Sequence, residues 1–125
     1  MQNQSAKFKI KLKDRAYQYS IKVIEFLDTL PEDSSTQIMA KQLLRSATSI
    51  GANIIEAQAS SSKRDFTNFF SYSLKSANES LYWLGLPKDA KKINNSQLEY
   101  LLSETKELAN TLGSSILTLK GKNKL

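Results

Sequence analysis

The chain has 125 residues and contains neither cysteine nor histidine, which excludes disulfides, thiolate chemistry and the commonest general base and zinc ligand. Its net charge is +6, with four lysines in residues 1–13, three in residues 120–125 and no acid in either segment. Because no apolar run is long enough for a signal peptide or a membrane span, we expect one cytoplasmic domain, without a cofactor or a bound metal.

Residues 1–13 are predicted to form a basic N-terminal arm. Within it, residues 7–13 alternate lysine with an apolar residue, a period-two pattern that is typical of extended chain. Phe8, Ile10 and Leu12 would share one side of this arm and lie along the rest of the protein or along a neighbouring subunit. The lysines would then face water.

The first two predicted helices span residues 14–29 and 35–59. Asp14 is a suitable N-cap for the first helix. The second helix is preceded by Ser34, with Gln37 three residues later, which is the spacing of a capping box. These signals predict a short turn between the two helices.

The third predicted helix spans residues 63–84. Ser62 and Asp65 at its start have the same capping-box spacing. Gly85 would end this helix, because glycine is common directly after a helix and Pro87 follows two residues later.

The fourth predicted helix spans residues 97–120, from a capping box formed by Ser96 and Glu99 to a stop at Gly121. Leucines recur along it at intervals of three and four residues, which indicates one buried face. Residues 122–125 would form a basic tail.

Four helices of these lengths with short connections predict an all-α, up-down-up-down antiparallel four-helix bundle over residues 14–121. Two stretches of it, Gln37–Ala59 and Asp65–Leu84, contain only six charged residues. A single small chain cannot cover helices that are apolar or small on so many faces. We therefore expect a homo-oligomer in which a second copy covers them.

The few charged and amide side chains within these two weakly charged stretches are predicted to form a structural polar network. Arg45, Asn53 and Glu56 share one face of the second helix, and the hairpin register places Arg45 level with Glu79. We predict an Arg45–Glu79 ion pair, since an isolated buried charge would cost several kcal/mol. The alternative, a catalytic or di-metal pair of Glu56 and Glu79, is disfavoured because about 16 Å of helix would separate the two carboxylates.

The third helix is rich in aromatic residues, more than one narrow face can hold. Phe69, Tyr72, Tyr82 and Trp83 are therefore predicted to contact a partner subunit. The alternative is packing in the core of the same bundle.

Basic residues are predicted to converge at one end of the bundle, because the topology places the start of the first helix, the loop before the third helix and the end of the fourth helix there. Such a cluster would bind nucleic acid through phosphates without reading bases, since Tyr17 and Tyr19 are expected to pack within the bundle. The alternative is that these residues only keep the protein in solution. The predicted nucleic-acid-binding residues are Lys7, Lys9, Lys11, Lys13, Arg15, Lys63, Arg64, Lys120, Lys122 and Lys124.

Three segments, residues 42–57, 62–66 and 76–80, resemble the bacterial four-helix bundle proteins found as reading frames within 23S ribosomal RNA intervening sequences. The resemblance extends over nearly the whole chain, and its most specific part is the run from Arg45 to Glu56. One departure is residues 57–59, where many members have a glycine after the glutamate.

This resemblance implies a closed ring of subunits, typically a pentamer, and no known catalysis. Proteins of that family are similar in fold to the accessory variability proteins of diversity-generating retroelements, which work with a reverse transcriptase and its template RNA. We therefore expect a non-enzymatic, ring-forming accessory protein that binds RNA or DNA without sequence specificity. The alternative is a scaffold that holds a protein such as a reverse transcriptase and makes no contact with nucleic acid.

Overall fold

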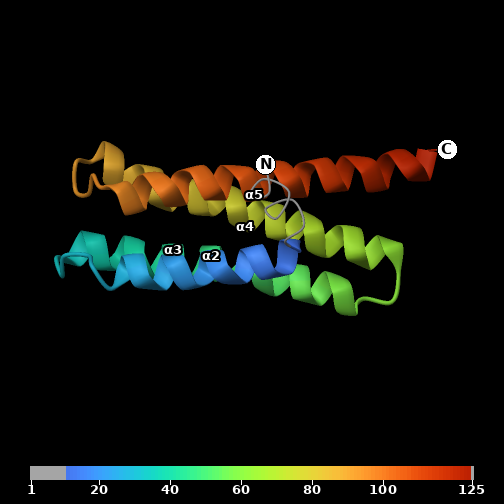
Figure 1. The fold of residues 1–125 in the computed structure, drawn as a ribbon, viewed down its shortest axis with the longest axis horizontal. Helices are drawn as coiled ribbons and strands as arrows, with labels where there is room; N and C mark the ends of the chain where they lie inside the picture. The colour runs from blue at the N-terminus through green and yellow to red at the C-terminus, as the bar shows by residue number, and fades with distance from the viewer. Residues whose placement is uncertain (1–10, 125) are drawn as a thin grey trace, which may run out of the picture.

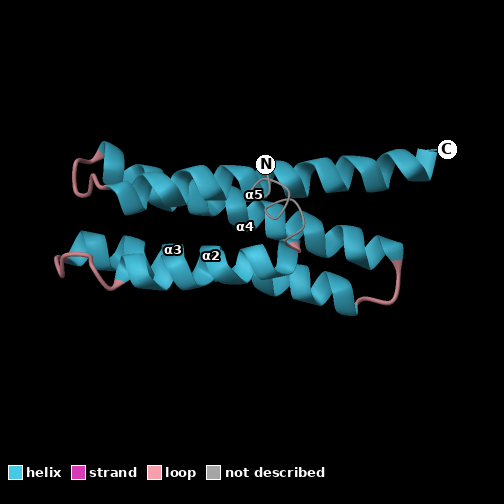
Figure 2. Cartoon of the chain, in the orientation of Figure 1, coloured by secondary structure: helices cyan, strands magenta, loops and turns pink. Residues whose placement is uncertain are grey.

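The structure is a computed structural model that describes residues 11–124, apart from the side chains of residues 122–124. Within this range it consists of four α-helices and the short turns between them (Figure 2). In chain order the helices are α2 (Leu12–Leu27), α3 (Ser34–Ala59), α4 (Lys63–Asp89) and α5 (Ser96–Lys124). Each runs antiparallel to the one before it, and α2 packs against both α3 and α5 (Figure 1). The predicted all-α, up-down four-helix bundle is confirmed.

The core of the bundle is formed by apolar side chains that recur every three or four residues along each helix. On α2 these are Ala16, Tyr19, Val23 and Phe26, all of them buried. The Tyr19 hydroxyl lies 2.6 Å from the Thr105 hydroxyl, so this buried polar group is hydrogen-bonded. Burial raises the pKa of Tyr19 to about 12. The expectation that Tyr19 packs within the bundle is therefore confirmed.

Gly51 lies where α2 and α3 approach each other closely. A Cβ atom on Gly51 would lie 3.4 Å from the Cβ of Ala16, which is an ordinary van der Waals contact. An alanine would therefore fit at this position, although glycine inside a helix costs up to about 1 kcal/mol relative to alanine. A larger side chain would force α2 away from α3.

The N-cap of α3 is Asp33 rather than the predicted Ser34. The Asp33 carboxylate accepts a hydrogen bond from the Thr36 backbone N–H at 3.2 Å and another from the Thr36 hydroxyl at 3.0 Å. The Gln37 side chain donates to the Pro31 carbonyl at 2.8 Å, so it takes no part in a capping box with Ser34. A carboxylate is a strong acceptor for orphan N–H groups, which explains why the helix begins one residue earlier.

The same one-residue shift occurs at α5, whereas the start of α4 agrees with the sequence. The Asn95 side chain accepts a hydrogen bond from the Leu98 N–H at 2.9 Å, so Ser96 is the first residue of α5 and not its cap. At α4, the Ser62 hydroxyl accepts from the Asp65 N–H at 3.1 Å, as predicted.

The predicted end of the third helix is wrong, because α4 continues through Gly85 and Pro87 to Asp89. Pro87 lacks a backbone N–H, but its side chain is buried, and this burial offsets the missing helical hydrogen bond. Two residues after the end of α4, Lys91 has a left-handed φ of 59°. The Lys92 N–H then donates to the Pro87 carbonyl at 2.9 Å, the long hydrogen bond of a Schellman motif with lysine in the usual glycine position.

The ends of the chain also differ from the prediction. Leu12 and Lys13 belong to α2 and are not part of an extended arm, since the helix begins directly after Lys11. Residues 7–10 of the predicted arm lie outside the described residues. At the other end, α5 continues past Gly121 to Lys124, so the predicted tail is largely helical.

Helix α2 is much shorter than its neighbours. It has 16 residues, whereas α3, α4 and α5 have 26, 27 and 29. In Figure 1, α2 begins well short of the end where the α3–α4 turn and the C-terminal end of α5 lie. The bundle therefore has four helices at one end and, among the described residues, three at the other. None of these helices is long and apolar enough to cross a membrane.

Candidate nucleic-acid interface

The three-helix end of the bundle carries part of the predicted basic cluster. Lys63 and Arg64 lie in the first turn of α4, Lys120 lies near the end of α5, and all three side chains are exposed. No carboxylate in the described part of the chain forms an ion pair with any of them. Their charges are thus available to a ligand.

The remaining predicted basic residues are placed differently. Lys11 directly precedes α2 and Lys13 lies in its first turn. Helix α2 begins well short of the three-helix end (Figure 1). Lys7 and Lys9 lie outside the described residues, as do the side chains of Lys122 and Lys124. Asp65, directly after Arg64 in the first turn of α4, is exposed too, so the excess of positive charge among the described residues at the three-helix end is modest.

The structure removes Arg15 from the predicted cluster. Its guanidinium donates two hydrogen bonds to the Glu104 carboxylate, at 2.7 and 2.9 Å, and one to Glu107 at 2.9 Å. The Arg15 and Glu104 side chains are only 19 % and 12 % exposed. The hydrogen bonding of the Arg15 guanidinium to the Glu104 carboxylate is the main reason why the pKa of Arg15 is raised. A guanidinium already held by two carboxylates joins α2 to α5 and does not offer its charge to phosphate.

Tyr17 is a candidate that the sequence analysis missed. It is 67 % exposed rather than packed in the bundle, and it lines a groove between α2 and α3 together with Lys13. Its position on α2, between the buried residues Ala16 and Tyr19, already indicated the outer face. Asp14 lines the groove beside Lys13, so the groove has no excess of positive charge, and an exposed aromatic ring in it suits an apolar partner surface as well as an unpaired base.

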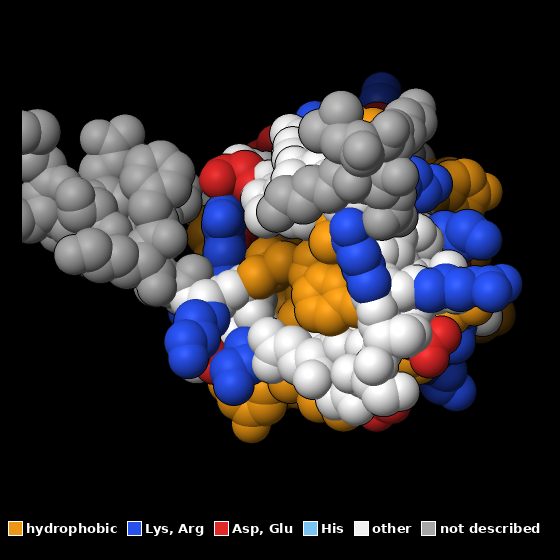
Figure 3. Space-filling model, turned by 90° about the vertical axis from the view of Figure 1, so that its right-hand side faces the viewer, with side chains coloured by type: hydrophobic (Ala, Val, Ile, Leu, Met, Phe, Trp, Pro, Cys, Tyr) orange, Lys and Arg blue, Asp and Glu red, His pale blue; other side chains and the backbone are white. Residues whose placement is uncertain are grey.

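An apolar hollow opens at the three-helix end between α4 and α5. Figure 3 views this end and shows lysine and arginine side chains around a patch of hydrophobic ones. The hollow has a volume of about 710 Å³, and none of the described residues that line it is charged. Its lining residues are Leu12, Phe66, Phe70, Asn110, Thr111, Ser114, Ser115, Thr118 and Leu119. The short first helix predicted from the sequence was the signal that such an opening would exist.

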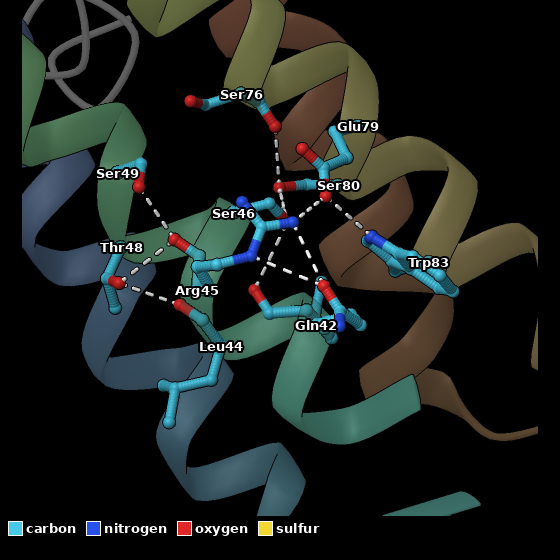
Figure 4. Close-up of polar contacts among 11 residues, drawn as sticks. Gln42, Leu44, Arg45, Ser46, Thr48, Ser49, Ser76, Glu79, Ser80 and Trp83 are labelled. Atoms are coloured by element: carbon cyan, nitrogen blue, oxygen red, sulfur yellow. Dashed lines mark hydrogen bonds and ion pairs between the residues drawn. The ribbon is translucent and has the colours of Figure 1, made fainter. Parts of the chain in front are cut away.

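The predicted Arg45–Glu79 ion pair is confirmed, and it joins α3 to α4 (Figure 4). Arg45 also donates to the Gln42 side chain at 3.0 Å, and the Trp83 indole N–H donates to Glu79 at 2.9 Å. The hydrogen bond from Trp83 and then the one from Arg45 lower the pKa of Glu79. The pair is not buried in the single chain, since the Arg45 and Glu79 side chains are 57 % and 37 % exposed.

The other two members of the predicted network lie apart from this pair. Asn53 donates to the Ser49 carbonyl of its own helix at 2.9 Å, and the Glu56 side chain is exposed. No group of three or more acidic residues that could hold a metal ion occurs in the described part of the chain.

Buried serines make the α3–α4 contacts that the sequence analysis missed. The Ser46 and Ser80 hydroxyls lie 2.8 Å apart (Figure 4), and the Ser73 hydroxyl donates to the Ile50 carbonyl at 2.8 Å. These contacts place α3 and α4 in the same relative register as the one that put Arg45 at the height of Glu79.

The predicted interface aromatics divide into two groups. Tyr72 and Tyr82 are 49 % and 58 % exposed on the outer side of α4. Phe69 and Trp83 are half-buried and pack against the core of their own chain. Tyr72 and Tyr82 thus remain available to a partner, whereas much of Phe69 and Trp83 is already covered.

Comparison with known proteins connects this architecture to a family. The model of the 23S rRNA-intervening sequence protein family matches residues 9–114. The chain belongs to that family. It is also similar to a crystal structure of a protein with unknown function from the S23 ribosomal protein family of Bacteroides thetaiotaomicron VPI-5482, with 36 % sequence identity and a TM-score of 0.78. The match covers 85 % of this chain and 98 % of that one.

No curated protein matches this chain. Neither the family description nor that of the Bacteroides protein names a catalytic activity. The family match ends at residue 114, so the last turns of α5 lie beyond it. Lys120 and three of the nine residues that line the hollow, Ser115, Thr118 and Leu119, lie beyond the matched residues.

Proposed function

We propose that this protein is a non-enzymatic, ring-forming accessory factor that binds RNA without sequence specificity through its three-helix end. The observation that carries this proposal is the set of exposed cations at that end, Lys63, Arg64 and Lys120, for which no acidic partner occurs among the described residues. Each phosphate that a lysine or arginine neutralises releases counterions, so a few such contacts give affinity that depends on salt and not on sequence.

The four-helix end offers no comparable surface. There Lys88 forms an ion pair with Glu99 at 2.7 Å, and Lys92 forms one with Asp33 at 3.4 Å. Opposite charges that neutralise each other do not attract a polyanion. The difference between the ends favours RNA binding at one of them over a general attraction to the whole protein.

Assembly into a ring is supported by two exposed apolar faces on different sides of the bundle. One face, on α3 and α4, includes Ile38, Tyr82 and Leu86, which are 61 %, 58 % and 38 % exposed. The other, on α2 and α3, includes Tyr17 and Ile55, which are 67 % and 51 % exposed. A ring requires two different faces that fit each other, because each subunit contacts its neighbours through opposite sides.

Charge reversal tests the RNA proposal. Lys63→Glu with Arg64→Glu should weaken binding of a single-stranded RNA at low salt at least tenfold, because two phosphate contacts become repulsive. The matched control is Lys41→Glu with Lys91→Glu, which changes the net charge equally at exposed positions away from the three-helix end. Equal losses of affinity in the two variants would contradict a localised site. No binding of RNA by the native protein would favour the scaffold alternative.

Tyr82→Glu tests the ring. Light scattering after size-exclusion chromatography should show a multiple of the 14.1 kDa chain mass for the native protein and smaller species for this variant. The control is Tyr100→Glu, at a tyrosine of α5 that is 50 % exposed and lies on neither apolar face. A native protein that elutes as a monomer would contradict assembly.

A further inference from the structure

The apolar hollow at the three-helix end has an aromatic floor. Phe66 and Phe70 of α4 both line it, and their rings stack with the centroids 4.6 Å apart and an angle of 29° between the planes. Phe70 is buried, whereas Phe66 is only half-buried. Part of the Phe66 side chain therefore remains accessible as an apolar aromatic surface.

The α5 side of the same hollow is polar. It is lined there by Asn110, Thr111, Ser114, Ser115 and Thr118, which follow one side of the helix. The side chains of Asn110, Ser114 and Thr118 are exposed and have no hydrogen-bond partner among the described residues. An apolar helix of another protein would cover these groups without giving them hydrogen bonds, which costs free energy. The hollow therefore suits a ligand that has an apolar face and a hydrogen-bonding edge.

Three exposed cations lie beside this hollow. Lys63 precedes Phe66 by three residues, about one turn of α4, and Arg64 is next to Lys63. On α5, Lys120 directly follows Leu119, which lines the hollow. Figure 3 shows basic side chains around the apolar patch at this end. A matching ligand thus carries negative charge outside the part that enters the uncharged lining.

We propose that the hollow is a binding site for an unpaired base of single-stranded RNA, which stacks on Phe66 while the three cations bind the neighbouring phosphates. The site rests on the proposed RNA binding and adds to it a contact that does not depend on charge. The face of a base suits the Phe66 ring, and its edge of donors and acceptors suits hydroxyl groups and the Asn110 amide. Every base has such a face, so this contact adds affinity without sequence specificity.

The size of the hollow agrees with such a ligand. Its volume of about 710 Å³ lies within the range of about 300–1,000 Å³ that is usual for sites that hold small organic molecules. The groove beside Tyr17 is the other candidate for stacking, but its lining includes Lys13 and Asp14, one charge of each sign. Its charges do not favour a phosphate, whereas the cations beside the hollow do.

Phe66→Leu tests the site, because leucine keeps an apolar side chain but offers no ring for stacking. This variant should bind a short single-stranded RNA at least about fivefold more weakly than the native protein does, and its affinity for inorganic polyphosphate, which has no bases, should not change. The salt dependence of RNA binding should keep its native slope, since stacking releases no counterions. The matched control is Phe69→Leu, at a half-buried phenylalanine of α4 that does not line the hollow, and it should keep the native RNA affinity.

The outcomes separate this site from the proposed function. Native RNA affinity in Phe66→Leu would overturn the base site but leave binding through the cations in place, and the hollow would then be a surface for a protein. Equal losses for RNA and polyphosphate would also overturn it, because they would show a general disturbance of the three-helix end. A native protein that binds no RNA would contradict the proposed function and the base site together.

Photocrosslinking to an RNA that contains 4-thiouridine locates the base directly. Cleavage after lysine and arginine gives one peptide of residues 65–75, which includes Phe66, and another of residues 107–120, which includes the polar side of the hollow. These two peptides should carry the crosslinked nucleotide. Crosslinks found only in other peptides, such as that of residues 16–22 with Tyr17, would overturn the assignment.

Discussion

At the end of the bundle that carries the α2–α3 and α4–α5 turns, side chains of α2, α3 and α4 and of the turns, among them Phe26, Leu43, Pro87 and Ile93, pack around a void of only about 10 Å³. An open groove of about 440 Å³ lies on the surface of this end, between α2 and the start of α5. At the opposite end, α4, α5 and the first residue of α2 line a hollow of about 710 Å³. The filled end also has ion pairs between its charged residues, whereas the open end has exposed cations without described partners. Charged side chains that pair with each other within the chain contribute to stability, whereas exposed cations without a partner are available to bind an anionic ligand.

The comparison assigns stability to the four-helix end and binding to the three-helix end. Packed interiors tolerate little loss of volume, so substitutions at the filled end should be costly. Residues that line the open end already contact water on one side and should matter less for folding.

Two leucines of the same helix sharpen the contrast. Leu98→Ala should lower the free energy of unfolding by about 3 kcal/mol, because Leu98 is fully buried at the filled end. Leu119→Ala, at the edge of the hollow, should cost less than about 1 kcal/mol because its side chain is only half-buried. Chemical denaturation of both variants gives the two values. Similar losses would show that the two ends are equally well packed.

Arg15→Met should lower the free energy of unfolding by about 2 kcal/mol, because it leaves the largely buried Glu104 carboxylate without its charged donor. The control is Lys22→Met, since the Lys22–Glu25 pair is 3.6 Å long and more than half exposed, and its loss should change stability little. The same Arg15→Met variant should bind RNA as the native protein does. A clear loss of RNA affinity in this variant would show that Arg15 takes part in RNA binding and would contradict its exclusion from the basic cluster.

The Arg45–Glu79 pair should contribute about 0.5 kcal/mol, because both side chains are more than a third exposed and water screens their attraction. A double-mutant cycle with Arg45→Ala and Glu79→Ala measures this coupling in the free energy of unfolding. A coupling of several kcal/mol would contradict this surface description and indicate that a neighbouring copy covers the pair in the assembled protein.

The smallest effect concerns the Asp33 cap at the filled end. Hydrogen bonds from the Thr36 hydroxyl and backbone lower the pKa of Asp33 from 3.8 to about 2. Its contribution is therefore fully present above about pH 4 and is lost as the pH falls toward 2. Asp33→Asn keeps a capping oxygen that does not titrate. The difference in Tm between native protein and variant should shrink between pH 4 and pH 2, and a constant difference would contradict this description.

Local signals predicted the fold well, because the helix periodicity and the hairpin register depend on neighbouring residues. The Ser62 cap and the Arg45–Glu79 pair follow from such spacing. The helix end that was predicted wrongly depends instead on tertiary packing. Burial of Pro87 allows α4 to pass Gly85, which no local pattern indicates.

The candidate site was less predictable than the fold. Arg15 is neutralised by Glu104, 89 residues away in the sequence, so its pairing depends on which helices become neighbours. The hollow likewise arises from the difference in length between α2 and the other three helices. A list of basic residues therefore overestimates the binding surface, because only the fold decides which charges remain unpaired.

The most direct test of the account is the salt dependence of RNA binding, measured with a single-stranded RNA for the native protein and for Lys63→Glu with Arg64→Glu. For single strands, each phosphate contact contributes about −0.7 to the slope of log K against log salt concentration. The account predicts a slope of about −2 or steeper for the native protein, reduced in magnitude by about 1.4 in the variant. A native slope near zero, or one that the variant leaves unchanged, would contradict binding at the three-helix end.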